Sequence, residues 1–484
     1  MLFNSLNFGL FLPIVFVLYW FFTKRNLKLQ NALLLFSSYF FYACWDWRFM
    51  FLLLFSTLLD YFTGLKMQDS QNQKHRKIWF WLSIIINLGF LGVFKYYNFF
   101  AESFAESVSH FGWKVSPLML NIILPVGISF YTFHGLSYVI DIYKNRIQSE
   151  RNFVDYAVFV SFFPLLVAGP IERATHLLPQ IKKQRTFDYA KAVDGLRQIL
   201  WGLFKKIVIA DNCAEYANHI FNNSADMNGS TLVLGALFFT FQIYGDFSGY
   251  SDIALGTARL FGIELLRNFA FPYFSRDIAE FWRRWHISLS SWFKDYLYIP
   301  LGGSKGGNWM RIRNTFIIFL VSGFWHGANW TFIVWGLLHA LFILPSIIMK
   351  TNRNNLEIVA QGKTFPTFKE FLQMLVTFVL TVFAWIFFRA ENIGHAFSYI
   401  SEIFSSSLFT APRFEGMENI FTTSVLITIF LLIEWKGREN QYALEGLKNV
   451  NLKPIRWLSY VFILLAIYFY GNFGDTVEFI YFQF

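Results

Sequence analysis

Apolar residues in this chain gather into long runs rather than alternating with polar residues. The period-2 alternation that a membrane β-barrel needs is not visible. Because a bilayer core requires about 20 mostly apolar residues per helix, the runs predict an all-α polytopic membrane protein with about ten to twelve membrane helices. The runs cover residues 8–22, 33–65, 78–100, 118–143, 196–210, 232–255, 315–349, 371–388, 420–433 and 458–470.

Two of these runs need a separate interpretation. The run at 33–65 is too long for one span and is interrupted by Asp46 and Arg48, so it predicts a pair of helices. The first run is preceded by no Lys or Arg and is followed by Lys24 without a small-residue cleavage site. We therefore expect a retained span rather than a signal peptide.

Basic residues mark alternate loops, and Lys and Arg accumulate in short cytoplasmic loops. The segment at 101–117 lies between the basic loops at 74–77 and 144–151. It carries Glu102 and Glu106 against one Lys114, which suits the opposite face of the membrane. This count predicts that both ends of the chain face outward. The basic loops contain Lys24, Arg25 and Lys28, then Lys74, Arg76 and Lys77, then Lys144, Arg146 and Arg151, then Arg311 and Arg313, then Lys350 and Arg353, then Lys436 and Arg438.

One apolar segment does not fit the alternation. Residues 156–171 leave one basic loop and enter another, and they include Pro164, Gly169 and Pro170. Irregular backbone at membrane depth is tolerated only where protein or a water-filled cavity surrounds it. The segment therefore predicts a re-entrant loop that lines a cavity, and an imperfect positive-inside rule is the open alternative.

Composition agrees with a membrane protein. Charged residues make up only 15% of the 484 residues, and aromatic residues make up 21%, whereas a soluble domain carries about a quarter charged residues. These values exclude a disordered chain and argue against a water-soluble enzyme. The net charge of +10 fits the basic loops rather than nucleic-acid binding. Cys44 and Cys213 stand apart from any Cys/His cluster, so neither a disulfide framework nor a metal site is indicated.

The stretch at 268–314 is too polar to cross a bilayer and too aromatic to be a free loop. Asp277 followed by Glu280 predicts a helix start, and Trp and Arg then recur at roughly helical spacing. We expect an amphipathic helix in the membrane interface, with His286 at or just below the membrane surface. A hydrogen-bonded structural His is the alternative, because Trp and Arg in such helices are usually anchors.

His326 lies in an apolar region of spanning length, where an ionisable side chain is by default a functional candidate. Burial tends to keep a His neutral, which is the state that accepts a proton. Gly323 and Gly327 flank His326 and would let a neighbouring helix or a substrate approach closely. A packed His bonded to a carbonyl is the alternative, and His339 is a secondary candidate for a polar partner.

Polar residues also gather at 241–252. Asp246 and Asp252 at membrane depth need partners such as Arg259 or hydroxyls, so a structural network and a substrate-binding wall both stay open. His134 is similarly ambiguous. The chain shows no Gly-rich phosphate loop, no nucleophile elbow and no paired-carboxylate glycosidase pattern, so those classes of enzyme are excluded.

Several separated motifs, taken in order, resemble the membrane-bound O-acyltransferase (MBOAT) family. The two strongest are Trp-Arg-Arg-Trp-His-Ile-Ser-Leu-Ser at 282–290 and Trp-His-Gly at 325–327. More narrowly, the chain is similar to the bacterial branch that includes the alginate O-acetyltransferase membrane protein. Supporting stretches lie at 125–133, 168–173, 246–252 and 298–303.

The resemblance implies a single membrane domain over residues 1–484. Its parts would be N-terminal helices at 1–115, a catalytic core with the motifs at 116–349 and C-terminal helices at 350–484. Membrane helices, the re-entrant segment and interfacial helices would surround a central tunnel. The resemblance also implies a multi-pass protein of the bacterial inner (plasma) membrane.

The resemblance further implies transfer of an acetyl group from a cytoplasmic thioester, such as acetyl-coenzyme A, toward a hydroxyl of an exported polysaccharide. His326 corresponds by motif to the family's catalytic His, and His286 to its second functional position. Periplasmic acetyltransferase proteins are expected partners, together with the lipid bilayer, and no bound cofactor, metal or nucleic acid is expected. The expected substrate-binding residues are Trp285, Trp325, Asn329, Asp246, Ser288 and Arg284.

The residues themselves suit that chemistry. A neutral His326 would take the hydroxyl proton, and His286, Asn329 or Trp N–H groups would stabilise the oxyanion. One alternative is D-alanyl transfer from a carrier protein to teichoic acid. A less favoured alternative is a transporter or flippase, which would need an internal repeat that the sequence does not show.

Overall fold

The computed structural model describes residues 1–24, 26–121, 123–471 and 479–480. Helices make up 73% of the structure, and the described part of the chain contains no strand, which confirms the predicted all-α class. Arg25, in the first predicted basic loop, and Ile122, in the predicted run at 118–143, lie outside the described residues.

Contacts group the chain into two compact units. Unit 1 comprises Met1–Ala192 and Ala258–Leu266, and unit 2 comprises Val193–Thr257 and Arg267–Phe484. The helices α10 (Tyr189–Leu203) and α12 (Gly229–Leu260) contribute residues to both units. The three-part division expected from the family resemblance stays a prediction.

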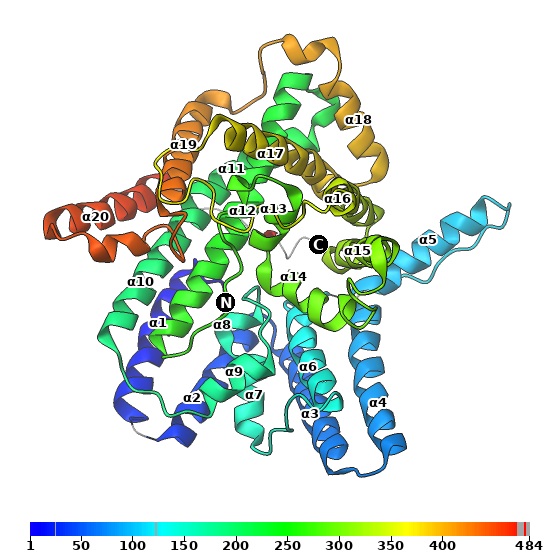
Figure 1. The fold of residues 1–484 in the computed structure, drawn as a ribbon, viewed down its shortest axis with the longest axis vertical. Coiled ribbons are helices and arrows are strands. Elements are labelled where there is room, and N and C mark those ends of the chain that lie inside the picture. The colour runs from blue at the N-terminus through cyan, green and yellow to red at the C-terminus, as the bar shows by residue number, and fades with distance from the viewer. Residues whose placement is uncertain (25, 122, 472–478, 481–484) are drawn as a thin grey trace. The chain divides into compact units, whose positions relative to one another are not determined.

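Unit 1 is a bundle in which α3, α4 and α6 lie side by side (Figure 1). A π-helical turn, η1, continues α1, and a second, η2, joins α4 to α5. The helices of unit 1 are α1 (Leu6–Val17), η1 (Leu18–Phe22), α2 (Leu27–Ala43), α3 (Trp47–Asp69), α4 (Gln73–Leu91), η2 (Gly92–Tyr96), α5 (Tyr97–Ser109), α6 (Ile128–Tyr143), α7 (Phe153–Ser161), α8 (Phe163–Leu166) and α9 (Ala174–Ile181).

The long apolar run at 33–65 forms a pair of helices, as predicted. α2 ends before Asp46 and α3 begins after it. The Asp46 carboxylate caps α3 by accepting a hydrogen bond from the Arg48 N–H at 2.9 Å. The charged interruption in the sequence is therefore the turn between the two helices.

The run at 118–143 is helical over only part of its length, because α6 begins at Ile128. The preceding Gly127 has a φ of 75°, a left-handed conformation that glycine adopts without strain. A Cβ on Gly127 would lie 1.9 Å from the backbone oxygen of Leu166. Close backbone packing against α8 therefore fixes where α6 starts.

The segment at 156–171 is irregular, as its Pro and Gly residues predict. α7 and α8 are separate helices that meet at Phe162, and Pro164 stands in the first turn of α8. Residues 155–172 are all buried, and the Phe163 N–H donates to Ser38 Oγ at 3.0 Å. Protein surrounds this irregular backbone, which is the condition for its tolerance at membrane depth. Re-entry into the membrane stays a prediction.

Glu172 ties the end of this segment to the rest of unit 1. Its N–H donates to His134 Nε2 at 3.1 Å, which gives His134 a structural role. The Glu172 carboxylate accepts the Leu266 N–H at 2.6 Å and contacts His176 Nδ1 at 2.8 Å. The stretch at 168–173 is therefore a structural anchor in this unit.

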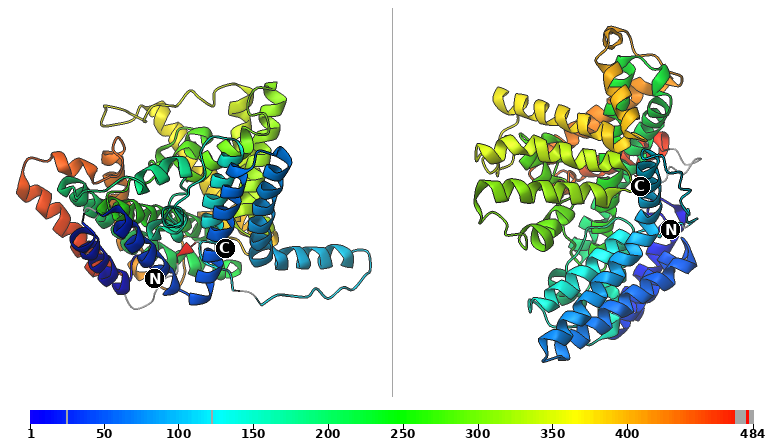
Figure 2. Two further views of the ribbon diagram at one scale, coloured as in Figure 1. Left: turned by 90° about the horizontal axis from the view of Figure 1, so that it is seen from below. Right: turned by 90° about the vertical axis from the view of Figure 1, so that its right-hand side faces the viewer.

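Unit 2 contains α15, α16 and α17, which appear as neighbouring rods in the right-hand view of Figure 2. In the same unit α11, α19 and α20 pack on the π-helix η3. The helices that lie wholly in unit 2 are η3 (Phe204–Ala210), α11 (Asp211–Asn222), η4 (Ser224–Asp226), η5 (Pro272–Phe274), α13 (Ile278–Arg284), α14 (Ile287–Phe293), η6 (Lys294–Tyr298), α15 (Gly307–His326), α16 (Trp330–Ile348), α17 (Phe368–Arg389), α18 (Ile393–Ile403), η7 (Ser406–Phe409), η8 (Met417–Asn419), α19 (Ile420–Gly437), η9 (Glu445–Asn449) and α20 (Lys453–Tyr470).

Glycines allow α15 and α16 to pack backbone against backbone. A Cβ on Gly323 would lie 2.2 Å from the Phe332 backbone oxygen, and one on Gly336 would lie 2.2 Å from that of Phe319. Since these contacts run in opposite directions along the two helices, α15 and α16 form an antiparallel hairpin. This confirms the prediction that Gly323 permits close helix approach.

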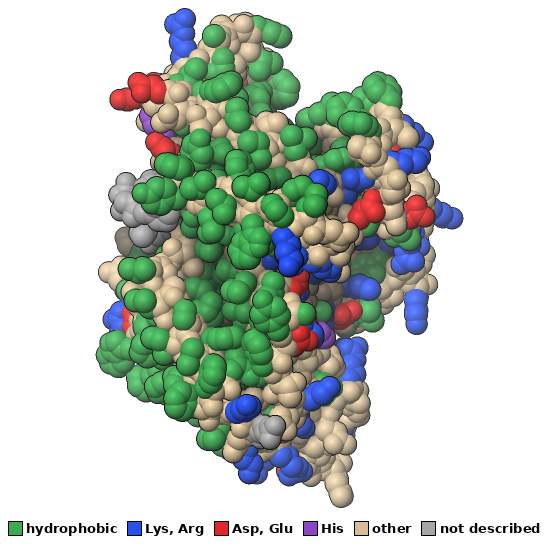
Figure 3. All heavy atoms as spheres, turned by 90° about the vertical axis from the view of Figure 1, so that its left-hand side faces the viewer, with side chains coloured by type: hydrophobic (Ala, Val, Ile, Leu, Met, Phe, Trp, Pro, Cys, Tyr) green, Lys and Arg blue, Asp and Glu red, His purple; other side chains and the backbone are tan. Residues whose placement is uncertain are grey.

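Within the described residues, six helices are long and apolar enough to cross a membrane. A seventh apolar helical segment, Leu6–Phe22, is shorter. Apolar side chains also make up much of the surface that Figure 3 shows, with Lys and Arg gathered in clusters between them. The predicted total of ten to twelve spans stays a prediction. The six helices are Trp47–Asp69, Gln73–Ser109, Gly229–Leu260, Trp330–Ile348, Phe368–Arg389 and Met417–Gly437.

The α15–α16 packing predicts that Gly336→Ala destabilises the protein. The added methyl group would meet the Phe319 backbone oxygen at 2.2 Å, and overpacking of this kind costs roughly 1–3 kcal/mol. We expect a lower thermal unfolding midpoint in detergent. Gly89→Ala on α4 is the matched control, since nothing lies within 4 Å of a Cβ there. Equal midpoints for the two variants would contradict the close packing.

The contact between His176 and Glu172 predicts a pH-dependent contribution to stability. The hydrogen bond to Glu172 raises the pKa of His176 above its ordinary value. A His whose pKa is raised by folding adds to the free energy of unfolding. This contribution is complete below about pH 6.5, the pKa of the unfolded state, and is lost as the pH rises through the pKa of the folded state. His176→Gln should therefore lower the unfolding midpoint more at pH 6 than at pH 9. The exposed His75→Gln is the control, and a deficit that does not change with pH would refute the ion pair.

Candidate active site

His326 stands at the turn of the α15–α16 hairpin, in unit 2. It is the last residue of α15, because Gly327 is extended with a φ of −163° and ends the helix. The side chain is 3% exposed. The ring centroid of Trp335, one turn and a half into α16, lies 5.0 Å from that of His326, and the Phe388 centroid lies at 5.4 Å. His326 is therefore held inside an aromatic enclosure rather than in the middle of a span.

His286 stands in a second turn of unit 2, between α13 and α14. Its φ of 43° is left-handed, and Asn268 holds the turn. The Asn268 carbonyl accepts the Ile287 N–H at 2.9 Å, and its side-chain oxygen accepts the Ser288 hydroxyl at 2.6 Å. Asn268 in turn donates to Ser251 Oγ at 3.1 Å.

The single amphipathic helix that we predicted through His286 is wrong, whereas the depth of His286 in the membrane stays a prediction. We expected one amphipathic helix through Trp285 and His286, but α13 ends at Arg284 and the chain turns sharply at His286. Both Trp285 and His286 are 0% exposed. The predicted helix start at Asp277 is confirmed, since its side chain accepts the Glu280 N–H at 2.7 Å.

The structure brings the two predicted catalytic His residues together. The ring centroids of His286 and His326 lie 6.3 Å apart. Trp325 contacts both rings, with its centroid 5.9 Å from His286 and 4.9 Å from His326. Burial lowers the pKa of His286 to about 3, so its imidazole is neutral at physiological pH and carries one N–H donor and one acceptor.

A third His, His339, lies behind this pair on α16. The Trp282 indole N–H donates to His339 Nδ1 at 3.2 Å. The His339 centroid lies 5.0 Å from that of Trp335, which itself packs on His326. We predicted His339 as a secondary candidate for a polar partner, and in the structure it accepts the hydrogen bond that orients the Trp282 indole.

Two buried indoles of this cluster keep a free N–H. Trp285 and Trp335 are both 0% exposed, and neither indole N–H has an acceptor within the described part of the chain. Trp285 packs on Tyr244 and Phe269 with ring centroids at 6.0 and 5.0 Å. A buried donor without a partner is costly, which makes these two groups candidates to bind an oxygen of a substrate.

The Arg residues of the stretch at 282–290 fix α13 rather than anchor it in lipid. Arg284 bonds to the Glu280 carboxylate at 2.7 Å, and its guanidinium also donates to the Ala270 backbone oxygen at 3.2 Å. Arg283 donates to the backbone oxygens of Asn352 and Asn355 at 2.9 and 2.7 Å. Arg284 is thus paired with a carboxylate one turn earlier on the same helix.

Ser288 and Asn329 hold structural hydrogen bonds. The Ser288 hydroxyl donates a hydrogen bond to the side-chain oxygen of Asn268. The Asn329 side chain caps α16 by accepting the Thr331 N–H at 3.0 Å, and its amide donates to the Glu391 backbone oxygen at 2.8 Å. Their predicted substrate contacts stay predictions.

Asp246 and Asp252 belong to a buried network of ion pairs on α12. Asp246 contacts Lys206 Nζ at 2.9 Å and accepts the Ile480 N–H at 2.7 Å. Asp252 contacts Lys205 Nζ at 2.6 Å. Arg259, which we named as a possible partner, bonds to Glu264 at 3.2 Å, and its pairing with these carboxylates stays a prediction.

Sequence reasoning missed the residues that hold the site in place. Lys205 and Lys206 interrupt the apolar run at 196–210, and they lie on the π-helix η3, where they neutralise the carboxylates of α12. Nothing in the sequence marked Asn268 as a residue that holds a turn, apart from its place at the start of the polar stretch at 268–314. Within the described residues, no group of three His, Cys, Asp or Glu could hold a metal ion.

The chain is similar to known membrane acyltransferases. The protein named "Probable alginate O-acetylase AlgI" of Pseudomonas aeruginosa is 41% identical over 400 residues, which cover 82% of this chain and 73% of that protein. The peptidoglycan O-acetyltransferase of Helicobacter pylori is 38% identical over 82% of this chain and 78% of its own length. The teichoic acid D-alanyltransferase of Bacillus subtilis is 28% identical over 57% of this chain and 71% of its own length.

The family resemblance is thereby confirmed over most of the chain. The family model for membrane-bound O-acyltransferases matches residues 144–389, a range that contains His286, His326 and His339. Together with the extent of the similarity to the O-acetyltransferases, this match shows that the chain belongs to the membrane-bound O-acyltransferase family and is an acyltransferase.

Proposed function

We propose that the protein transfers an acetyl group from a cytoplasmic thioester, such as acetyl-coenzyme A, to or toward a hydroxyl of an exported polysaccharide. The observation that carries the proposal is the pair formed by His286 and His326 inside one aromatic enclosure, with ring centroids 6.3 Å apart. The relatives named for O-acetylation of alginate and of peptidoglycan support a sugar hydroxyl as the acceptor.

In this proposal His326 acts as the general base. Its neutral imidazole takes the proton of the acceptor hydroxyl while that oxygen attacks the thioester carbonyl carbon. The carbon–sulfur bond of the resulting tetrahedral intermediate then breaks. The thiolate leaves and recovers the proton from His326, which gives an ester and a free thiol.

The negative charge on the carbonyl oxygen needs hydrogen-bond donors in a dry site. His286 is suited to this, because its low pKa keeps it a neutral imidazole that donates one N–H. Trp335 is suited as well, since its buried indole N–H has no acceptor among the described residues and its ring lies 5.0 Å from that of His326.

The aromatic enclosure serves the same reaction by excluding water. Trp325, Trp335 and Phe388 all pack on the His326 ring within 5.4 Å, centroid to centroid. A closed apolar surrounding slows hydrolysis of the thioester and strengthens the electrostatic interactions inside it. Of the predicted substrate contacts, Trp325 is the one that touches both His rings.

The setting of the reaction follows from the same proposal. The protein would lie in the bacterial inner membrane, with its basic loops toward the cytoplasmic donor and with periplasmic acetyltransferase proteins completing the modification. The net charge of +10 would attract the anionic donor. D-alanyl transfer from a carrier protein is the second candidate, which the similarity to teichoic acid D-alanyltransferases favours.

The proposed base predicts that His326→Gln abolishes polymer acetylation. Glutamine cannot take a proton at this position, so the acetate content of the exported polysaccharide should fall to the level of cells without the protein. Mass spectrometry of the polymer measures this. His286→Asn should also lower acetylation, because Asn tolerates the left-handed backbone but lacks the imidazole.

The matched control is His110→Gln at the exposed position that follows α5, which should leave acetylation unchanged. The amount of each variant in the membrane is measured in the same cells. Normal polymer acetate in a His326→Gln strain with normal protein levels would refute the assignment of the base.

The proposed oxyanion donor predicts that Trp335→Phe lowers turnover while leaving the fold intact. Phenylalanine keeps an aromatic ring at this position and removes the indole N–H together with part of the ring volume. Loss of one such donor costs about 10²–10³-fold in kcat, with little change in KM for the donor. Trp309→Phe, at a position that is 77% exposed, is the control. Unchanged kcat in Trp335→Phe would remove this residue from the site.

A further inference from the structure

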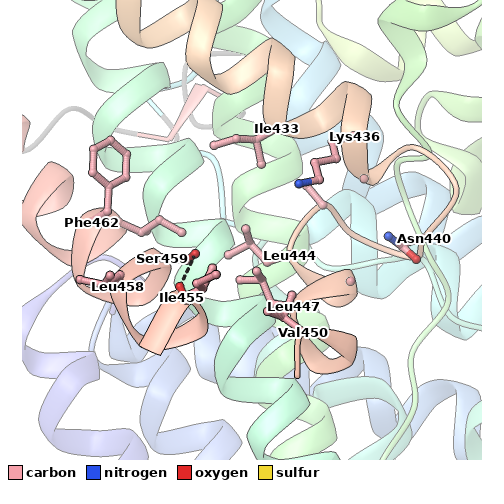
Figure 4. A pocket seen from close by; sticks show the side chains of 14 residues that line it. Ile433, Lys436, Asn440, Leu444, Leu447, Val450, Ile455, Leu458, Ser459 and Phe462 are labelled. Atoms are coloured by element: carbon pink, nitrogen blue, oxygen red, sulfur yellow. Dashed lines mark hydrogen bonds between the residues drawn. The ribbon is translucent and has the colours of Figure 1, made fainter. Parts of the chain in front are cut away.

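A separate cavity of about 540 Å³ lies in unit 2, between the end of α19, the η9 segment and α20 (Figure 4). Its volume falls in the range of small-molecule sites, about 300–1,000 Å³. None of its lining residues belongs to the His286–His326 site. The lining residues are Ile433, Lys436, Gly437, Asn440, Ala443, Leu444, Gly446, Leu447, Val450, Ile455, Leu458, Ser459, Phe462 and Ile463.

Nine of the fourteen residues that line this cavity are aliphatic or aromatic, two are glycines, and the polar ones are Lys436, Asn440 and Ser459. Figure 4 shows Leu444 and Leu447 on one side and Leu458 and Phe462 of α20 on the other. The one hydroxyl in the wall, on Ser459, is already bonded to its own helix at the Ile455 backbone oxygen, 2.9 Å away. The cavity therefore fits a hydrocarbon chain and offers little to a polar ligand inside it.

A single amine stands at the edge of this apolar space. Lys436, the penultimate residue of α19, is exposed, and within the described part of the chain no carboxylate pairs with it. The nearby carboxylates are engaged elsewhere: Glu439 contacts Arg438 at 3.7 Å, and Glu445 contacts Lys448 at 2.7 Å. The free charge at the mouth is thus positive and complements an anion.

The position of Lys436 along α19 suits a lipid headgroup. α19 lies within the candidate membrane span Met417–Gly437, so Lys436 is at the end of that span, where membrane proteins place basic residues toward anionic lipid. Lys453 and Arg456 stand in the first turn of α20, on either side of the lining residue Ile455 in the sequence. α20 also exposes apolar side chains, with Leu458 66% and Phe462 53% exposed.

We propose that this groove binds an anionic phospholipid, with one acyl chain between α19, η9 and α20 and the phosphate on the Lys436 ammonium. The lipid acyl chain is buried against the apolar walls. The Lys436 ammonium at the mouth favours a headgroup with net negative charge. The lipid would brace α20 against α19. The site is independent of the acyl-transfer chemistry at His326.

The test is native mass spectrometry of the purified full-length protein in detergent, titrated with phosphatidylglycerol or with phosphatidylcholine. The wild-type protein should retain one phosphatidylglycerol and prefer it over phosphatidylcholine. Lys436→Gln should reduce that preference about fivefold, the expected effect of one basic residue near an anionic lipid surface. Lys436→Arg should retain it, and Lys369→Gln, at an exposed position on α17, should leave it unchanged.

A second variant tests the acyl-chain groove separately from the charge. Ser459→Trp fills the cavity and should weaken binding of both lipids without removing a charge. The unfolding midpoint of each variant shows that it is folded, and Lys436 is exposed, so its substitution does not disturb packing. The proposal is overturned if Lys436→Gln and wild type bind phosphatidylglycerol equally, if wild type binds both lipids equally, or if a folded Ser459→Trp variant binds as wild type does.

Discussion

The close approach of α15 and α16 is the constraint on which the candidate site depends. Gly323 and Gly336 leave no room for a side chain between the two backbones, so the helices form a tight hairpin. The hairpin turn then places His326 at its end and folds Trp335 back against the imidazole. A wider helix spacing would separate this base from the indole that packs on it.

The second half of the site depends on a turn rather than on a helix. His286 occupies a left-handed conformation that is costly for a residue with a side chain, and the bonds from Asn268 to Ile287 and Ser288 maintain it. Buried ion pairs between η3 and α12 brace the neighbouring polypeptide, since Ser251 on α12 accepts the Asn268 amide. Strain at this position is consistent with a functional residue.

The sequence alone predicted the helical class, the helix pair around Asp46 and the helix start at Asp277, and it marked His326 as a candidate. Each of these follows from a local signal: apolar length, a capping carboxylate, or an ionisable group in an apolar run. The burial of His286 was not predictable, because helical spacing of Trp and Arg resembles an interfacial helix whether or not the chain turns in the middle. Lys205 and Lys206 were missed because their partners on α12, Asp252 and Asp246, lie 47 and 40 residues away along the chain.

The central claim is that His326 is the base in the transfer of an acetyl group from a thioester to a hydroxyl. The most direct measurement uses the purified protein in liposomes with labelled acetyl-coenzyme A or with a D-alanyl-loaded carrier protein, and follows loss of label from each donor in the presence of a polysaccharide acceptor. We expect label to leave acetyl-coenzyme A with wild type and to stay on it with His326→Gln. Equal loss of label with the two proteins, or transfer from the D-alanyl carrier alone, would contradict the claim.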